Sequence, residues 1–306
     1  MIRPFIKWAG GKTRVLPDLL PLLPKGDCLI EPFVGGASVF LNTDYRRYVL
    51  ADINPDLINL YRVAVADTEL LIRDAQSMFM TGNTEIEYLG RRAEFNFLRA
   101  TGAGFALQRA VLFLYLNRHG FNGLCRYNQS GEFNVPFGRY RSPYFPASEI
   151  RLFAEKARDT NAVFRVAPFC KTIEGHASPD AVIYCDPPYL PASDTANFTQ
   201  YHTAPFSIGH HITLAVALAG ANRRDGAQCV ISNSDTPVTR EIYHTFEFHE
   251  IAVQRSISAN AITRGAAKEV IGVLTANCQE SLPLRNGSTL CGLNTGFSGE
   301  LRGMGL

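Results

Sequence analysis

The chain has 306 residues, of which 46% are hydrophobic and 19% charged, and its formal net charge is +2. This composition is ordinary for a globular enzyme, and the small net charge does not by itself indicate a nucleic-acid partner, so any basic surface has to be local. The seven cysteines form no CxxC pair, the N-terminus has no signal-like apolar core and no apolar run is long enough to span a membrane, which together predict a cytoplasmic protein.

The first candidate binding segment is the glycine-containing turn KWAGGK at residues 7–12. It carries Lys7, Lys12 and Trp8, the only tryptophan of the chain. The threonine that follows completes the Gly-Lys-Thr of a P-loop, but that template requires a glycine where this chain has Ile6, so a phosphate cradle of this kind is not predicted. An alternative interpretation places Trp8 in the core and leaves the two lysines solvated.

A strand, a glycine turn, a helix and a second strand follow between residues 28 and 52. In the turn EPFVGGAS at residues 31–38, Gly35 allows the backbone to approach a ligand closely. The turn does not match GxGxxG, so a nucleotide-like ligand is favoured over a pyrophosphate. The second strand ends in Asp52, at the distance expected of an acid that binds ribose hydroxyls. This order predicts an α/β fold with a doubly wound sheet.

The middle of the chain has a different pattern. From residue 57 to about residue 118, apolar side chains recur at helical spacing and predict helices that pack in the core. Two alternating runs at residues 117–141 then predict a hairpin rich in aromatic, amide and arginine side chains, with Glu132 as its one acid. Such a ribbon suits a DNA groove, where arginine pairs with guanine and an inserted ring replaces a lost stacking partner. The alternative is a solvated hairpin with a few aromatic anchors.

The sequence changes character abruptly at Asp186. The apolar run before it predicts a strand buried on both faces, and Asp186, Pro187, Pro188 and Tyr189 then form a stiff lip at the edge of the sheet where ligands bind. A carboxylate and a proline-fixed carbonyl can accept the two N–H bonds of an exocyclic amino group and free its lone pair for group transfer. Tyr189 can stack on an extruded base. For this tetrapeptide alone, a simple turn after a core strand is the alternative.

The rest of the chain continues the α/β pattern. Further strands are predicted at residues 162–166, 229–233, 247–253 and 269–275, and further helices at 15–23, 149–158 and 208–221. Residues 277–306 are rich in Gly, Ser and Asn without periodicity, which predicts a disordered tail. The seven histidines show no HExxH spacing, so no metal site is predicted.

Taken together, these motifs resemble those of the adenine-N6 DNA methyltransferases that use S-adenosylmethionine, and within them the Dam methylases that modify the adenine of GATC. The resemblance covers residues 5 to about 274 and rests on KWAGGK, EPFVGGAS, ADIN, the hairpin NRHGFNGLCRYNQSGEFNVPFGRY, DPPY and SNSDT. The order, with cofactor motifs before the catalytic motif and a DNA-reading insertion between them, is that of the family's alpha group. It implies a Rossmann-like methyltransferase that acts on double-stranded GATC by base flipping, as a monomer without a protein partner.

The resemblance also implies roles for individual residues. The cofactor would be lined by Trp8, Lys12, Phe33, Gly35, Asp52 and Asp186, and the target adenine would be held by Asp186, Pro187, Pro188 and Tyr189. Arg126 and Lys7 would read guanines, Leu124 and Pro136 would contact the thymine methyl, Phe121 and Asn122 would enter the space left by the flipped base, and Arg118 and Arg139 would face phosphates. Phe121 replaces the tyrosine usual in close relatives and the loop at 264–268 is less basic, which implies unchanged sequence preference with a weaker hold on flanking phosphates.

The expected organisation is a catalytic domain at residues 1–58 and 147–276, a target-recognition domain at 59–146 and the tail at 277–306. Three alternatives remain open at this point. They are an amino methyltransferase with another target, either cytosine N4 or a different adenine site, a phosphate-binding NTPase and a non-catalytic DNA-binding protein.

Overall fold

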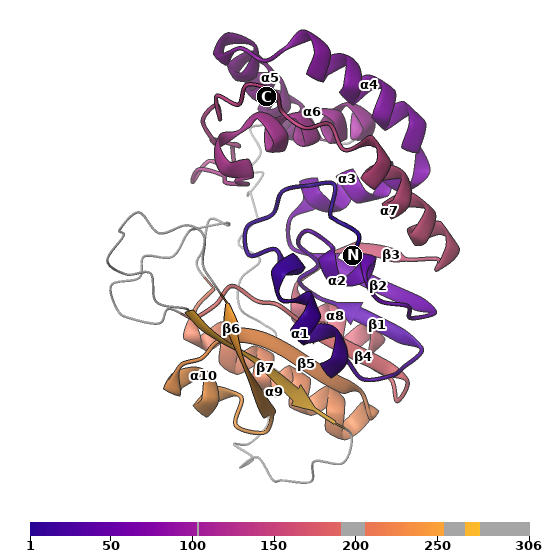
Figure 1. Cartoon of the computed structure of the whole chain (residues 1–306), viewed down its shortest axis with the longest axis vertical. Coiled ribbons are helices and arrows are strands. Elements are labelled where there is room, and N and C mark those ends of the chain that lie inside the picture. The colour runs from indigo at the N-terminus through magenta and orange to yellow at the C-terminus, as the bar shows by residue number, and fades with distance from the viewer. Residues whose placement is uncertain (103, 191–205, 254–266, 276–306) are drawn as a thin grey trace, which may run out of the picture.

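The computed structural model describes residues 1–102, 104–190, 206–253 and 267–275 (Figure 1). The predicted tail at residues 277–306 and residues 264–266 of the predicted loop lie outside the described part.

The centre of the molecule is a seven-stranded sheet with the strand order β3-β2-β1-β4-β5-β7-β6. The strands are β1 Cys28–Glu31, β2 Arg47–Asp52, β3 Val163–Val166, β4 Ala181–Cys185, β5 Gln228–Ser234, β6 Glu247–Val253 and β7 Ala267–Leu274. The first five in spatial order are parallel, and β7 pairs antiparallel with both of its neighbours. The strand order reverses between β1 and β4, so this edge is a topological switch point. The predicted doubly wound α/β fold is confirmed.

The sheet is buried on both faces, which explains why its strands read as continuous apolar runs. Every residue of β4 is buried. Val182 and Tyr184 belong to one hydrophobic core, whereas Ile183 and Cys185 belong to the other, as the period-2 alternation of a strand requires. Helices therefore cover both sides of the sheet.

On one face lie α3 Pro55–Ala66 and α7 Ala147–Asp159, and on the other lie α8 Phe169–His176 and α9 Ile208–Asp225, with α10 Pro237–Ile242 against α9. Local signals fix the ends of α9. It begins with a capping box between Ser207 and His210 and ends at Gly226, whose left-handed φ of 69° suits glycine. The predicted helices at residues 149–158 and 208–221 are thus confirmed, and each extends beyond its predicted bounds.

A helical part lies at one end of the molecule, with α3 and α7 between it and the sheet (Figure 1). It comprises α4 Thr68–Thr81, α5 Glu85–Ala100 and α6 Ala106–His119. Helix α6 lies at its centre, since residues 110–119 are all buried and α3, α4 and α5 pack around it. The helices predicted between residues 57 and 118 are confirmed. No helix in the described ranges has the length and apolar character needed to cross a membrane.

The helix predicted at residues 15–23 is wrong as a single element. The chain instead forms three short turns, η1 Lys12–Arg14, α1 Leu16–Leu19 and η2 Leu20–Leu22, followed after β1 by the short helix α2 Ser38–Leu41. Pro17 and Pro21 each lie in the first turn of a new segment. Proline lacks the N–H that a continuous helix would need at these positions, so the apolar run breaks into pieces.

The predicted hairpin is an antiparallel pair of segments without continuous strands. Isolated bridges join Gly120 to Phe137 and Tyr127 to Phe133, and a short 3-10 turn, η3 Phe121–Gly123, lies near its start. Backbone bonds cross between its two segments, for example from Phe121 to Pro136 and from Asn134 to Arg126. Side chains of α5 add further bonds: the Asn96 side chain bonds both N and O of Phe133, and the Tyr88 hydroxyl donates to the carbonyl of Val135. Helix side chains therefore satisfy backbone groups that a regular hairpin would pair across its own strands.

Candidate active site

Three carboxylic acids meet at the carboxyl ends of adjacent parallel strands. Glu31 ends β1, Asp52 ends β2, and Asp186 directly follows β4. Burial raises the pKa of Asp52 and Asp186 to about 6 and that of Glu31 to about 8. Burying a carboxylate costs free energy, and strongly shifted pKa values are typical of functional sites. Three such acids at a topological switch point therefore mark a candidate site.

Asp186 forms an ion pair with Lys12. The Lys12 Nζ lies 2.8 Å from Oδ1 of Asp186 and 4.6 Å from the centroid of the Tyr189 ring. The Tyr189 hydroxyl in turn donates to Glu269 on β7, at 3.0 Å. Burial is the largest cause of the raised Asp186 pKa, Lys12 lowers that pKa, and Glu269 raises it. With a pKa of about 6, Asp186 is mostly ionised at neutral pH, so both of its oxygens can accept hydrogen bonds, and its side chain is still 19% exposed.

The segment after the two prolines is attached to β5. The backbone N–H of Leu190 donates to Oδ1 of Asn233 at 3.2 Å, and the hydroxyl of Ser234 donates to the Leu190 carbonyl at 2.6 Å. Both side chains are buried at the carboxyl end of their strand. The predicted lip is thus an anchored segment rather than a free turn.

Asp52 lies beside the glycine turn. One of its oxygens accepts a bond from the backbone N–H of Gly35 at 3.2 Å, and the other accepts from Asn54 at 2.9 Å. Gly35 has a left-handed φ of 45°, and a Cβ atom there would lie 2.9 Å from the Trp8 ring. Only glycine allows the indole to pack so closely on this turn.

Phe33 extends the same region with an aromatic wall. Its ring stacks on Phe169 at a centroid distance of 5.5 Å and meets Phe206 edge-on at 5.8 Å. The turn at residues 7–12 carries both Trp8 and Lys12, and so connects the surroundings of Asp52 with those of Asp186. The structure therefore brings all six residues predicted for the cofactor to one edge of the sheet.

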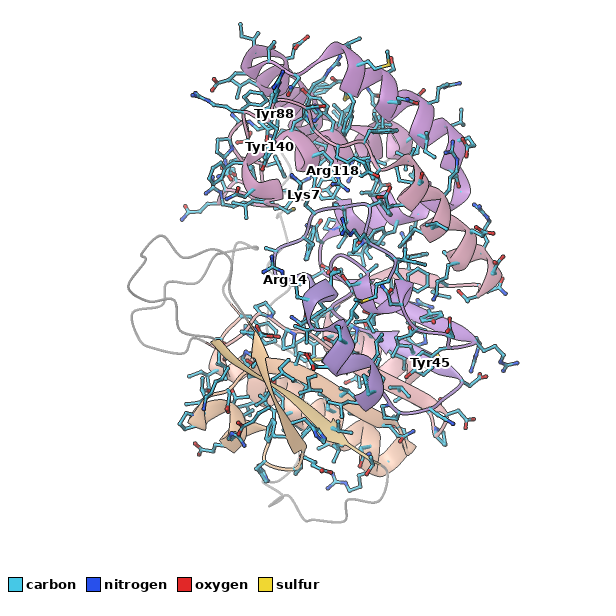
Figure 2. All side chains as sticks on the ribbon, viewed as in Figure 1. Lys7, Arg14, Tyr45, Tyr88, Arg118 and Tyr140 are labelled. Carbon is cyan, nitrogen blue, oxygen red and sulfur yellow. The ribbon has the colours of Figure 1, made fainter. Side chains whose placement is uncertain are left out.

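The same N-terminal turn is also joined to α6 and to the hairpin that is predicted to read DNA. Asn117, fully buried at the end of α6, accepts a bond from the Lys7 backbone N–H at 2.9 Å and donates to the Lys7 carbonyl at 2.7 Å. The Lys7 side chain crosses Gly123 so closely that a Cβ there would lie 2.4 Å from Cδ, and its Nζ lies 4.2 Å from the Tyr140 ring centroid. Figure 2 shows Lys7 and Tyr140 where the N-terminal segment meets the helical part.

Most residues predicted to contact DNA are accessible. Phe121 is 48% exposed, and Asn122, Arg126 and Pro136 are exposed as well, whereas Leu124 is half-buried. The guanidinium of Arg126 donates to Oδ1 of Asn134 at 2.8 Å, which holds it on the hairpin surface. Arg139 is 78% exposed and lies 3.4 Å from Glu85. These placements are compatible with the predicted contacts, which stay predictions.

Arg118 lies in the interior rather than at the surface where a phosphate contact is predicted. Arg118 is only 7% exposed, and two nitrogens of its guanidinium donate to the carbonyl of Phe5. The ring of Tyr144 lies 5.6 Å from the guanidinium carbon (Figure 2 shows Arg118 next to Lys7). Burial lowers its pKa, but the group is still a cation whose donors hold the N-terminal segment against α6.

Two acids that the sequence interpretation did not select have clear roles. Glu269 holds Tyr189, as described above. Asp56, which is 1% exposed, accepts bonds from Arg99 at 2.6 Å, Arg109 at 2.8 Å and the Tyr127 hydroxyl at 2.8 Å. Nothing local to Asp56 in the sequence reveals these partners, which are 43 to 71 residues away.

Comparison with known proteins agrees with this geometry. The family of D12 class N6 adenine-specific DNA methyltransferases matches residues 8–257. The chain is 49% identical over 273 residues to a DNA adenine methylase of Escherichia coli, covering 89% of this chain and 95% of that protein. A DNA adenine methylase of Salmonella typhi is 48% identical over 272 residues, with the same coverage, and one of Haemophilus influenzae is 47% identical over 277 residues, covering 90% and 94%. The chain that carries this acidic lip at its switch point therefore belongs to the D12 class N6 adenine-specific DNA methyltransferases.

Proposed function

We propose that this adenine-specific DNA methyltransferase transfers the methyl group of S-adenosylmethionine to adenine N6 in double-stranded GATC, after the adenine has flipped out of the duplex. The observation that carries the proposal is the placement of Asp186 at the switch point of the sheet, where Lys12 pairs with its carboxylate at 2.8 Å and lies 4.6 Å from the centroid of the Tyr189 ring.

The residues around Asp52 fit S-adenosylmethionine. Backbone N–H groups orient both oxygens of Asp52, and each oxygen keeps a further lone pair for a ribose hydroxyl. Gly35 keeps the turn open to a ligand, and Trp8 and Phe33 supply apolar walls. The buried Oε1 of Glu31 has no hydrogen-bond partner among the described residues, so the edge also holds unused acceptor capacity. When bound, the cofactor supplies an electrophilic methyl group on a sulfonium.

The protein's own contribution is to activate and align the amine. The Asp186 carboxylate and the Pro187 carbonyl accept the two N–H bonds of the adenine amino group, while the Tyr189 ring stacks on the base. Holding the nucleophile in line with the methyl group supplies on the order of 7–11 kcal/mol, so direct transfer needs mainly alignment. With a pKa of about 6, Asp186 can also take the proton that the methylated amine loses and return it to water.

The hairpin and the Lys7 turn would read and open the DNA. Exposed Arg126 pairs with a guanine, Lys7 contacts the first guanine, and Phe121 fills the gap left by the flipped adenine. Flipping costs a few kcal/mol, which stacking of about 1–3 kcal/mol per aromatic contact can largely offset. The exposure of Phe121 and the close packing of Lys7 on the hairpin support this arrangement.

We assign target recognition to the helical part and the hairpin, and catalysis to the sheet with its covering helices. The expected boundary after residue 58 falls inside α3 Pro55–Ala66, a continuous helix that packs on both parts, so we place the boundary after α3. The five described cysteines are free thiols, which favours the reducing cytoplasm, and the site as proposed needs no partner chain.

The test is expression in cells that lack GATC methylation. Plasmid from cells making the wild-type enzyme is expected to resist nucleases that cut only unmodified GATC, to be cut by nucleases that require the methylated site, and to contain N6-methyladenine by nucleoside mass spectrometry. Asp186→Ala, made at the same level and with unchanged DNA affinity, is expected to leave the plasmid unmodified. Methylated nucleosides without protection at GATC would refute the sequence preference, and protection by Asp186→Ala would refute the role of the acid.

A further inference from the structure

A buried imidazole lies behind the lip. His211, on α9, is fully buried, with Nε2 3.1 Å from the carbonyl oxygen of Pro188 and Nδ1 2.9 Å from the hydroxyl of Tyr243. A carbonyl only accepts, so Nε2 must carry the proton, and Tyr243 then donates to Nδ1. Burial lowers the pKa of His211 to about 4, which keeps the ring neutral in this one tautomer.

The Pro188 carbonyl occupies a special position in the backbone. The two proline rings fix φ at residues 187 and 188, and a residue before a proline is confined to extended ψ, which restricts ψ at residues 186 and 187. Between Asp186 and Tyr189, proline chemistry therefore leaves only ψ of Pro188 and φ of Tyr189 free, the two torsions on either side of the peptide that joins these residues. The ψ of Pro188 sets the direction of its carbonyl, which is the group that His211 binds.

The chain beyond this torsion is held by other elements. The Tyr189 hydroxyl binds Glu269 on β7, and Leu190 binds Asn233 and Ser234 on β5. These bonds fix the far end of the Tyr189 side chain and the next residue, but none of them acts on the peptide that joins Pro188 to Tyr189. His211, on α9, constrains this peptide through its bond to the Pro188 carbonyl.

The imidazole itself has little freedom to move. Phe206 packs edge-on against it at a centroid distance of 4.8 Å, and Tyr243 is held in turn by Phe246 at 5.8 Å. Because the imidazole is fully buried, no water competes for its Nε2–H donor, although Pro188 itself is exposed. A fully packed ring can therefore transmit the position of α9 to the lip.

We propose that His211 is a positioning residue for methyl transfer: by binding the Pro188 carbonyl, it sets the angle of the Tyr189 ring relative to the Asp186 carboxylate. This inference rests on the proposed function, in which Tyr189 stacks on the adenine whose amino group Asp186 binds. The residue acts only through the backbone of the lip and touches neither substrate.

A matched pair of substitutions tests the proposal. In His211→Gln, the side-chain amide can donate to Pro188 and its oxygen can accept from Tyr243, so both bonds are kept. His211→Met has nearly the same length and flexibility but can make neither bond. Both full-length variants would be compared with the wild type in single-turnover methyl transfer to a GATC duplex, together with KM for each substrate and thermal unfolding.

We expect His211→Gln to keep the transfer rate within about threefold of the wild type, and His211→Met to lose about ten- to a hundredfold in kcat with little change in either KM, because misalignment acts on the chemical step. The proposal would be overturned if the Gln and Met variants had the same unfolding temperature and transferred the methyl group at the same rate. It would also be overturned if His211→Met weakened only the KM for a substrate and left kcat unchanged. If Met simply unfolds the protein, the double variant His211→Phe with Tyr243→Phe removes both buried polar partners together and is expected to show the same kcat loss. An inactive wild-type enzyme would instead refute the proposed function.

Discussion

The pKa of Asp186 can be moved in opposite directions by changing its two charged neighbours. Lys12 lowers that pKa from 2.8 Å away, and Glu269 raises it. Lys12→Met removes the cation but keeps an unbranched chain, whereas Glu269→Gln removes a negative charge and keeps an oxygen that can accept from Tyr189. We expect the acid limb of the pH–rate profile to shift to higher pH in Lys12→Met and to lower pH in Glu269→Gln.

The size of the effect follows from the burial of the pair. The side chains of Lys12 and Asp186 are only 8% and 19% exposed, so solvent screens their interaction weakly. An opposite charge at this distance lowers a carboxyl pKa by about 1–3 units. Starting from about 6 in the wild type, Lys12→Met should therefore move the limb to near pH 7 or above. Glu269→Gln should move it down by less, because Glu269 contributes least among the causes of the shift.

The measurement is kcat/KM for duplex DNA between pH 5 and pH 9, with the cofactor held at saturation. Activity requires the ionised carboxylate, so it falls as the pH drops through the Asp186 pKa. Because every variant carries the same cofactor, the difference between their limbs reports the mutated neighbour. Lys12→Arg, which keeps the charge, is the control for the loss of lysine packing.

The outcome that matters is the position of the limb rather than its height. If Lys12→Met is slow at every pH but its limb coincides with that of the wild type, Lys12 binds a ligand without tuning Asp186. If both variants move the limb in the same direction, Asp186 is not the group that titrates, and its assignment as the acceptor loses its support.

Three further predictions follow from single side chains. Arg118→Ala should cost about 1–3 kcal/mol of folding stability, since the Phe5 carbonyl loses a charged donor, and should leave the salt dependence of DNA binding unchanged. Arg139→Ala should instead leave the unfolding temperature unchanged and reduce by about one the slope of log DNA affinity against log salt concentration. Phe121→Ala should remove about 1–3 kcal/mol of stacking and so reduce base flipping, which lowers the fluorescence of 2-aminopurine placed at the target adenine. Phe121→Tyr should retain the fluorescence. Equal signals for the two variants would contradict the proposal that Phe121 fills the gap left by the flipped base. Glu31→Gln should stabilise the fold by about 2–4 kcal/mol at pH 8. Burial raises the Glu31 pKa from 4.5 to about 8, so the wild-type protein loses stability as the pH rises through this window. Urea unfolding at pH 5 and pH 8 measures the difference, and the variant would show no such gain at pH 8 if the Glu31 pKa were ordinary.

The sheet and its switch point could be predicted from sequence because the information is local. The continuous apolar run of β4, the glycine turn before α2 and the acids that end or follow the strands are each signals contained in a few consecutive residues. Parallel topology then brings the strand ends to one edge without further information. The presence of α7 and α9 followed from the same kind of pattern, although both helices extend beyond their predicted bounds.

What sequence could not predict depends on contacts between distant segments. Arg118, Arg126 and Arg139 lie in one basic stretch and look alike in the sequence, yet Arg118 is buried because Phe5, 113 residues away, supplies its acceptor. Glu269 lies 80 residues from the Tyr189 that it holds, on a strand whose position only the antiparallel end of the sheet reveals. The residue type determines the charge and hydrogen-bonding groups of these side chains. Tertiary packing determines whether each side chain points into the interior or to the surface, and which partner it contacts.

The same packing joins the proposed cofactor site to the proposed DNA-reading hairpin through a short segment of the chain. Asp52 faces the cofactor edge, and Asn54 caps α3 and bonds the thiol of Cys125 on the hairpin. Two residues later, Asp56 binds Tyr127 of the hairpin and also Arg99, which bonds the carbonyl of Gly131 at the hairpin turn. Removing one partner from such a buried charged network leaves the other charges unpaired, so these contacts are costly to break. These contacts connect the hairpin through residues 52–56 to the acid for which we propose cofactor binding, so a displacement at either place can be transmitted through five consecutive residues.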